Sequence, residues 1–294
     1  AIELHESLGS TPTAVDEAVS AHLAVLDTAR RRAGKQADRY DAPRQIDAYG
    51  DSLARDDGRI YLGVNALDEV LGGVRRGEVC GIMARPGVGK TLFMGHLIGL
   101  ASNANVNTVM FSLEMPVDQI VSRLARSVYD VGRSELESAA LGGHLDSARY
   151  HDTYNPLVIV DTPGLSIADI ERQVRVEENP QLVLIDHLGL VGGYRGLSTY
   201  DRVSAIARDT KEMAKRTNCA VVIAVQVSRE AGGDGSRSLT LGSARDSGII
   251  EEVMDYLIAL RRPPNQGRSD VQRFTEKDIL LLSLLKNRHG AVGI

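Results

Sequence analysis

The chain has 294 residues, of which 43% are hydrophobic, so it is long enough for one large domain or for a domain with a smaller appendage. Its formal net charge is −5, which excludes a generally basic nucleic-acid coat and leaves any binding of polyanions to local patches. Both cysteines lie in apolar runs, so we expect buried thiols rather than a disulfide or a metal pair. No apolar run reaches the length of a membrane span and no signal-peptide pattern is seen, so we expect a soluble, cytoplasmic protein.

The first 58 residues differ in pattern from the rest. Residues 14–32 carry apolar side chains at helical spacing and end in three arginines, and a second helical segment is expected at 43–53. The acidic, glycine-ended stretch at 56–58 then interrupts the pattern. We therefore expect 1–58 to form a short helical N-terminal arm or linker, a candidate oligomerisation element, and 59–294 to form the main domain.

Residues 84–91 have the form of a phosphate-binding loop, or P-loop. They read Ala-Arg-Pro-Gly-Val-Gly-Lys-Thr, between an apolar run at 78–83 and a segment with helical spacing. The glycines let the backbone point its N–H groups at a phosphate, and the following helix adds its N-terminal dipole. Lys90 would reach the β- and γ-phosphates, and the Thr91 hydroxyl would bind Mg²⁺. The predicted nucleotide-binding residues are Arg85, Pro86, Gly87, Val88, Gly89, Lys90 and Thr91.

Apolar runs alternate with amphipathic segments along the rest of the chain. This pattern predicts an α/β fold with a mostly parallel central sheet that is covered by helices on both faces. Strands are expected at 78–83, 107–113, 157–160, 182–185, 220–225, 255–260 and 279–285, and helices at 117–128, 167–176 and 202–216. In such folds ligands lie at the carboxyl ends of the strands.

Polar residues follow four of these strands, and we expect all of them at the edge of the sheet that holds the P-loop. Asp186 fits an acid that holds Mg²⁺ beside Thr91, the alternative being a surface acid at a strand end. Glu114 fits a base that orients or deprotonates the water attacking the γ-phosphate. Its alternative role is to complement the dipole of the helix that follows.

The other two strand ends carry an amide and two cations. Gln226 fits a sensor of the γ-phosphate, or else a polar residue that caps its strand. Lys286 and Arg288 could stabilise transition-state charge in cis or on a neighbour's nucleotide, the alternative being a simple basic loop. His187 and His289 show no partner pattern, so we expect both to be structural.

One motif points elsewhere. Residues 161–164 have the D-x-x-G form of a GTPase element. No N-K-x-D motif, which would read guanine, is present in the sequence. A GTPase is therefore disfavoured.

Taken in order, these motifs resemble the C-terminal RecA-like ATPase domain of DnaB-type replicative helicases. The most specific is F-S-L-E-M-P at 111–116. It is accompanied by A-R-P at 84–86, D-T-P-G-L-S-I at 161–167, I-D-H-L at 185–188, R-D-S-G-I-I-E-E at 245–252 and K-N-R-H-G at 286–290. The resemblance covers about 59–294, predicts a RecA-like P-loop NTPase fold, and explains the D-x-x-G element.

The resemblance implies an ATP-dependent helicase in DNA replication. Such an enzyme is a hexameric ring that uses ATP and Mg²⁺ and moves 5′→3′ on single-stranded DNA. Lys90, Thr91, Asp186 and Glu114 would act in cis, whereas Lys286 and Arg288 would act in trans. Loops near 192–199 and 229–243 would face the DNA, with Arg195, Arg229 and Arg237 as candidate contacts. Their Gly- and Ser-rich composition suits phosphate binding, although it also suits loops that are merely mobile.

The chain also departs from the family. Residues 1–58 are too few for the usual N-terminal helical domain, which leaves a primase or loader partner open and fits an orphan or phage-type relative. An alternative function is a regulatory or recombination ATPase of the RecA, RadA or KaiC kind. A protein-binding module that keeps nucleotide only as a structural ligand is disfavoured, because Lys90, Glu114 and Asp186 are all present.

Overall fold

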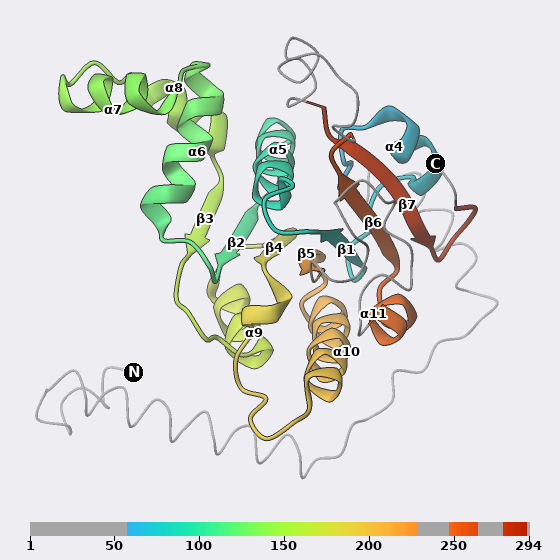
Figure 1. The fold of residues 1–294 in the computed structure, drawn as a ribbon. Helices are drawn as coiled ribbons and strands as arrows, with labels where there is room; N and C mark the ends of the chain where they lie inside the picture. The colour runs from blue at the N-terminus through green and yellow to red at the C-terminus, as the bar shows by residue number, and fades with distance from the viewer. Residues whose placement is uncertain (1–57, 228–246, 264–278, 293–294) are drawn as a thin grey trace, which may run out of the picture. The chain divides into compact units, whose positions relative to one another are not determined.

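The computed structural model describes residues 58–227, 247–263 and 279–292 (Figure 1). In these ranges seven strands form one sheet, in the order β3-β2-β4-β5-β1-β6-β7. Six strands run parallel to one another, and they are β1 (Val79–Ala84), β2 (Thr108–Ser112), β3 (Leu157–Val160), β4 (Leu182–Asp186), β5 (Ala220–Gln226) and β6 (Tyr256–Arg261). The last strand, β7 (Leu281–Asn287), pairs with β6 in the antiparallel direction. The predicted mostly parallel sheet is confirmed.

Helices cover both faces of this sheet. One face packs against α4 (Asn65–Leu71), α5 (Lys90–Asn103), α6 (Val117–Tyr129) and α8 (Ser147–Tyr154). The other packs against the 3₁₀ turn η1 (Leu188–Leu190), α9 (Ile167–Val176), α10 (Thr199–Thr217) and α11 (Ser247–Val253). Figure 1 shows α5 and α6 on one side of the strands and α9 and α10 on the other. No helix in the described ranges is both long and apolar enough to cross a bilayer.

The continuous apolar strands follow from this layering. Successive side chains of a strand point to opposite faces, so a strand that is covered twice must be apolar at every position. In β5, Val222 packs into the core under α5 and α6, whereas Val221 and Ile223 pack into the core under α9 and α10. All three side chains are fully buried. The strands therefore read as unbroken hydrophobic runs in the sequence.

The helices α6, α9 and α10 confirm the three predicted after the P-loop helix. The described ranges also contain helices that were not predicted, namely α4, α7 (Arg133–Leu141), α8 and α11. Of these, α7 and α8 are mostly polar, and Leu136 is the one buried residue of α7. Asp146 caps α8, because its carboxylate accepts hydrogen bonds from the backbone N–H groups that open the helix. The helices predicted at 14–32 and 43–53 lie outside the described residues, so the proposed domain boundary stays a prediction.

Candidate functional site

The P-loop connects β1 to α5 as predicted. β1 ends at Ala84 and α5 begins at Lys90, with Gly89 as its N-cap residue. Gly87 and Gly89 have φ angles of 75° and 128°, which a residue with a Cβ adopts only at a cost. A Cβ added to Gly87 would meet no atom within 4 Å. The space beside Gly87 is therefore open to a ligand.

The side chain of Lys90, the first residue of α5, reaches back to the start of the P-loop. Its side chain is 7% exposed, and Nζ lies 3.5 Å from the Arg85 carbonyl oxygen and 3.4 Å from Gln226 Oε1. Burial lowers the pKa of Lys90, and the carboxylates of Asp186 and Glu114 oppose that shift. Both contacts are long for hydrogen bonds, so the ammonium group is only weakly held. Such a group can turn to an incoming phosphate while Gln226 stays beside it.

A hydroxyl and a carboxylate meet next to Lys90. Thr91 Oγ1 donates a hydrogen bond of 2.8 Å to Asp186 Oδ2. Asp186 is 2% exposed, and its other oxygen, Oδ1, has no hydrogen-bond partner among the described residues. Buried carboxylate oxygens normally have partners, so an orphaned one beside a hydroxyl suits a hard cation such as Mg²⁺. The structure thus brings together the two residues predicted to hold the metal, and the metal site itself stays a prediction.

Arg85 has unsatisfied hydrogen-bond donors that could bind an anion. Its side chain is 9% exposed, and neither Nε nor Nη2 has a hydrogen-bond partner within the part of the chain that the structure describes. Two buried guanidinium nitrogens without acceptors near the start of a P-loop suit a phosphate oxygen. The loop thus offers unsatisfied donors, and Asp186 an unsatisfied acceptor. Together they fit a nucleotide that carries a divalent cation.

Glu114 lies at the same edge of the sheet. Ser112 pairs in register with Asp186, and the Leu113 N–H donates a 2.8 Å hydrogen bond to the Asp186 carbonyl oxygen. The Glu114 side chain follows directly and is 55% exposed. Its Oε2 lies 3.7 Å from Nε2 of His187. No partner was predicted for His187, although its place next to Asp186 was the available signal.

The carboxyl ends of the parallel strands therefore form what we call the phosphate edge, which contains the P-loop, Glu114, Asp186 and Gln226. Lys286 and Arg288 were also expected there, and this prediction is wrong. Because β7 runs antiparallel, its carboxyl end pairs with the start of β6, where Asn287 lies opposite Tyr256. Tyr256 in turn pairs with Cys80, four residues before β1 ends, which is about 13 Å along the strand. The two cations lie at the opposite edge of the sheet.

Asp255 holds Arg288 at that opposite edge. The carboxylate is 2% exposed, and its Oδ1 forms a 3.0 Å ion pair with Arg288 Nη1. Its Oδ2 accepts hydrogen bonds from Lys211 Nζ at 2.5 Å and from the Val79 N–H at 2.8 Å. Burial alone would raise the pKa of Asp255, but the bonds from Lys211, Val79 and Arg288 outweigh it and lower that pKa. Asp255 was not predicted from the sequence, because one acid at the start of a strand carries no distinctive pattern.

Lys286 is held by a helix end. Its Nζ donates to the carbonyl oxygens of Glu251 and Glu252, the latter at 3.1 Å, in the last turn of α11. Carbonyl groups at a helix C-terminus carry partial negative charge, which favours a cation there. Burial lowers the pKa of Lys286. Lys286 and Arg288 are therefore both bound by groups of their own chain.

The candidate DNA contacts are described only in part. Arg195 lies exposed in the segment between η1 and α10, where Gly193 and Gly196 have φ angles of 90° and 79°. Gly192 fastens the start of this segment through a 2.8 Å hydrogen bond from its N–H to the Leu165 carbonyl oxygen. Arg229 and Arg237 lie outside the described residues. The D-x-x-G element has a structural use, since Asp161 Oδ2 accepts a 2.9 Å hydrogen bond from the Val117 N–H that opens α6.

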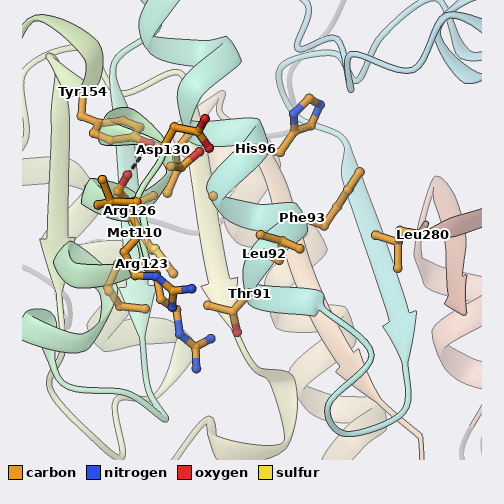
Figure 2. Close-up of a pocket in the computed structure, with 16 residues that line it drawn as sticks. Thr91, Leu92, Phe93, His96, Met110, Arg123, Arg126, Asp130, Tyr154 and Leu280 are labelled. Atoms are coloured by element: carbon orange, nitrogen blue, oxygen red, sulfur yellow. Dashed lines mark hydrogen bonds between the residues drawn. The ribbon is translucent and has the colours of Figure 1, made fainter. Parts of the chain in front are cut away.

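A groove of about 910 Å³ runs alongside α5 (Figure 2). Thr91 and Leu92 line it from α5, and Arg123 and Arg126 line it from α6. Of the predicted site residues, Thr91 alone is among the 16 residues that line the groove. The groove is therefore a neighbour of the phosphate edge, which is formed by the P-loop and the strand ends.

The comparisons with known proteins agree with this geometry. A family model described as "DnaB-like helicase C terminal domain" matches residues 60–294. Replicative DNA helicase DnaB of Treponema pallidum is 30% identical over 243 residues, which is 80% of this chain and 52% of that protein. DnaB of Geobacillus stearothermophilus is 29% identical over 245 residues, or 80% of this chain and 53% of that protein.

Two solved structures share the fold. One is described as an ATPase domain, and it superposes with a TM-score of 0.73 at 23% identity, covering 87% of this chain and 94% of that one. A DnaB-like replicative helicase, solved in a study of its interactions with primase, gives a TM-score of 0.69 at 22% identity, covering 99% and 78%. The RecA-like fold is therefore confirmed. The chain spans about half the length of the curated relatives it matches, and it belongs to the DnaB-like helicase C-terminal domain family.

Proposed function

We propose that this domain hydrolyses ATP with Mg²⁺ and uses the energy to move a ring of subunits along single-stranded DNA during replication. The observation that carries the ATPase proposal is the contact between Thr91 and Asp186, with Asp186 Oδ1 left unsatisfied beside the P-loop. Mg²⁺ would neutralise charge on the transferred phosphoryl group when bound. The family supports the helicase proposal.

Each residue of the phosphate edge then has a defined task. The backbone N–H groups of the P-loop residues other than Pro86, which has none, would bind the phosphates together with the ammonium of Lys90. Thr91 and Asp186 would hold the metal. Glu114 orients the attacking water and accepts its proton. Gln226, 3.4 Å from Lys90 Nζ, lies where an amide can sense whether a γ-phosphate is bound.

The position of Lys286 and Arg288 supports a site that is shared between subunits. They lie at the opposite edge of their own sheet, so they are too far to reach their own P-loop in this arrangement. A head-to-tail contact brings one subunit's opposite edge to the next subunit's phosphate edge, and a closed series of such contacts is a ring. In a hexamer of this kind Arg288 would act in trans as an arginine finger, with Lys286 beside it.

DNA would run through the ring and contact it through phosphates. Arg195 is exposed in a glycine-containing segment, and six copies would gather positive charge around one pore although each protomer is acidic overall. Arg229 and Arg237 would contribute in the same way. Movement in the 5′→3′ direction is what the family resemblance implies, and the identity of a primase or loader partner is left open.

The test is steady-state ATP hydrolysis by the full chain, with and without single-stranded DNA, with Lys90→Ala as the control. We expect hydrolysis that DNA stimulates and that the control abolishes. Displacement of a labelled strand from a forked duplex then tests unwinding. Hydrolysis that DNA leaves unchanged would contradict the helicase proposal and favour a regulatory ATPase. A Lys90→Ala variant as active as the unsubstituted chain would contradict the ATPase site itself.

A further inference from the structure

His187 is held at one ring nitrogen and faces Glu114 with the other. Its Nδ1 accepts a 3.2 Å hydrogen bond from the Gly189 N–H, and its Nε2 lies 3.7 Å from Glu114 Oε2. The imidazole is 9% exposed, whereas the Glu114 side chain is 55% exposed. A fixed ring therefore faces a side chain that is otherwise free to change its rotamer.

The bond at Nδ1 decides what Nε2 can do. In a neutral imidazole one nitrogen carries the hydrogen and the other accepts. Because Nδ1 accepts from Gly189, the hydrogen lies on Nε2, where it points to Glu114. Nε2 also carries a hydrogen in the protonated ring, so this donor does not depend on the titration of His187. Burial lowers the pKa of His187, against the opposing carboxylates of Glu114 and Asp186.

The backbone brings the two residues together without help from the side chains. Leu113 and Asp186 are joined by a 2.8 Å hydrogen bond, and Glu114 and His187 directly follow them in the chain. A distance of 3.7 Å exceeds a hydrogen bond, but contacts of catalytic groups are often long before the substrate arrives. A small rotation of Glu114 closes this gap, while His187 stays where Gly189 holds it.

We infer that His187 is a positioning residue for Glu114, and that its Nε2–H holds one carboxylate oxygen so that the other faces the attacking water. This inference rests on the proposed ATPase function and adds one residue to it. His187 need not touch ATP or the metal. It would act on the chemical step by keeping the base in its productive rotamer, because a misplaced base lowers the rate without weakening binding.

Two amide substitutions separate the two ring nitrogens. In His187→Gln the side-chain amide reaches the position of Nε2 and keeps a donor for Glu114. In His187→Asn the shorter amide reaches the position of Nδ1, so it keeps an acceptor for the Gly189 N–H but cannot reach Glu114. The matched control is His151→Asn, the same change at an exposed position of α8. A merely structural His187 would tolerate Asn at least as well as Gln.

A third variant moves the ring without removing it. A Cβ on Gly189 would lie 2.9 Å from His187 Cε1 and 3.1 Å from Nδ1, which is too close. Gly189→Ala should therefore displace the imidazole and weaken its hold on Glu114. This variant keeps the inference testable if substitutions at 187 impair folding.

The measurements are kcat and KM for ATP, binding of a fluorescent ATP analogue, and thermal unfolding. We expect His187→Asn and Gly189→Ala to lower kcat about tenfold with little change in KM or in analogue binding. His187→Gln should retain most of kcat, and His151→Asn should match the unsubstituted chain. Equal kcat values for His187→Asn and the unsubstituted chain would overturn the inference, as would a loss with Gln as large as that with Asn. A chain that hydrolyses no ATP before any substitution would overturn the proposed function, and this inference with it.

Discussion

The two edges of the sheet differ in how their charged groups are satisfied. At the phosphate edge Arg85 and Asp186 have buried polar atoms with no hydrogen-bond partner in the described ranges, and Lys90 makes only long contacts. At the opposite edge Asp255 binds Arg288, Lys211 and a backbone N–H at once. The phosphate edge therefore has unsatisfied charged groups that a charged ligand could bind. At the opposite edge, the cations are already bound by other groups of the chain. Under the proposed shared site, the second edge would present these cations to the nucleotide of a neighbouring subunit.

The largest expected effect is a loss of ATP hydrolysis when the arginine of the opposite edge is removed. Arg288→Ala should lower kcat for ATP about a thousandfold or more, because the finger stabilises charge that develops in the transition state. Binding of a fluorescent ATP analogue should stay near normal, since the P-loop is intact. Parallel measurements of turnover and of analogue binding check this. A parallel loss of binding would show that Arg288 is structural.

A mixing experiment distinguishes action in trans from action in cis. Lys90→Ala keeps the finger and loses the P-loop lysine, and Arg288→Ala does the reverse. If the finger acts on a neighbour, random mixed rings place an intact finger against an intact P-loop at roughly a quarter of the interfaces. Mixing the two inactive variants should then restore hydrolysis. An inactive mixture, with exchange of subunits verified, would contradict the shared site.

The next effect concerns the stability of the opposite edge. Asp255→Asn removes the charge that holds Lys211 and Arg288, and leaves the nearly buried Lys211 ammonium without a carboxylate partner. We expect the free energy of unfolding to fall by about 3 kcal/mol. Urea denaturation measures this. The control is Glu137→Gln, which removes an exposed ion pair with Arg133 and should cause no measurable change.

The same variant gives a pH dependence with a defined sign. The pKa of Asp255 is lower in the folded protein than its ordinary value of 3.8. Its ionised form therefore stabilises the fold fully above about pH 5, and this contribution is lost as pH falls through the folded pKa. Asparagine does not titrate, so the stability gap between Asp255→Asn and the unsubstituted chain should narrow below about pH 4. A difference in stability between the two proteins that stays constant down to about pH 3 would contradict the lowered pKa of Asp255.

Much of the phosphate edge could be predicted because its signals are local. The P-loop glycines, the acid that ends β4 and the glutamate after β2 follow apolar runs, and parallel strands bring such ends together. The direction of β7 could not be predicted in this way. A period-two or unbroken apolar pattern identifies a strand but is the same in both directions. Lys286 and Arg288 were therefore predicted at the wrong edge.

The partners of Asp255 and His187 were hidden for a related reason. Asp255 contacts Lys211 and Val79, which are 44 and 176 positions away in the chain. Such contacts depend on the strand order, in which β6 lies beside β1, and no local pattern encodes that order. His187 could more nearly have been identified from the sequence, because it directly follows Asp186. Its role still required the pairing of β2 with β4, which brings the Glu114 side chain near it.

A smaller effect sharpens the assignment of the metal site at the phosphate edge. Thr91→Ala removes the hydroxyl that lies 2.8 Å from Asp186. We expect about a tenfold increase in the Mg²⁺ concentration needed for half-maximal hydrolysis, because one of the oxygen ligands is lost. Thr91→Ser keeps the hydroxyl and should behave like the unsubstituted chain. If Ser and Ala were equally impaired, packing of the threonine methyl group rather than metal binding would explain the effect.

The smallest effect tests how the segment 286–290 is fastened. His289 Nε2 lies 2.7 Å from Glu78 Oε1, but the histidine side chain is 46% exposed. Glu78 keeps its bonds from the Tyr256 hydroxyl and the Arg75 N–H when the imidazole is removed. His289→Ala should therefore lower the free energy of unfolding by less than about 1 kcal/mol. Urea denaturation of His289→Ala and Asp255→Asn side by side measures which variant loses more free energy of unfolding. A larger loss for His289→Ala would show that Glu78, and not Asp255, contributes most to the stability of the opposite edge.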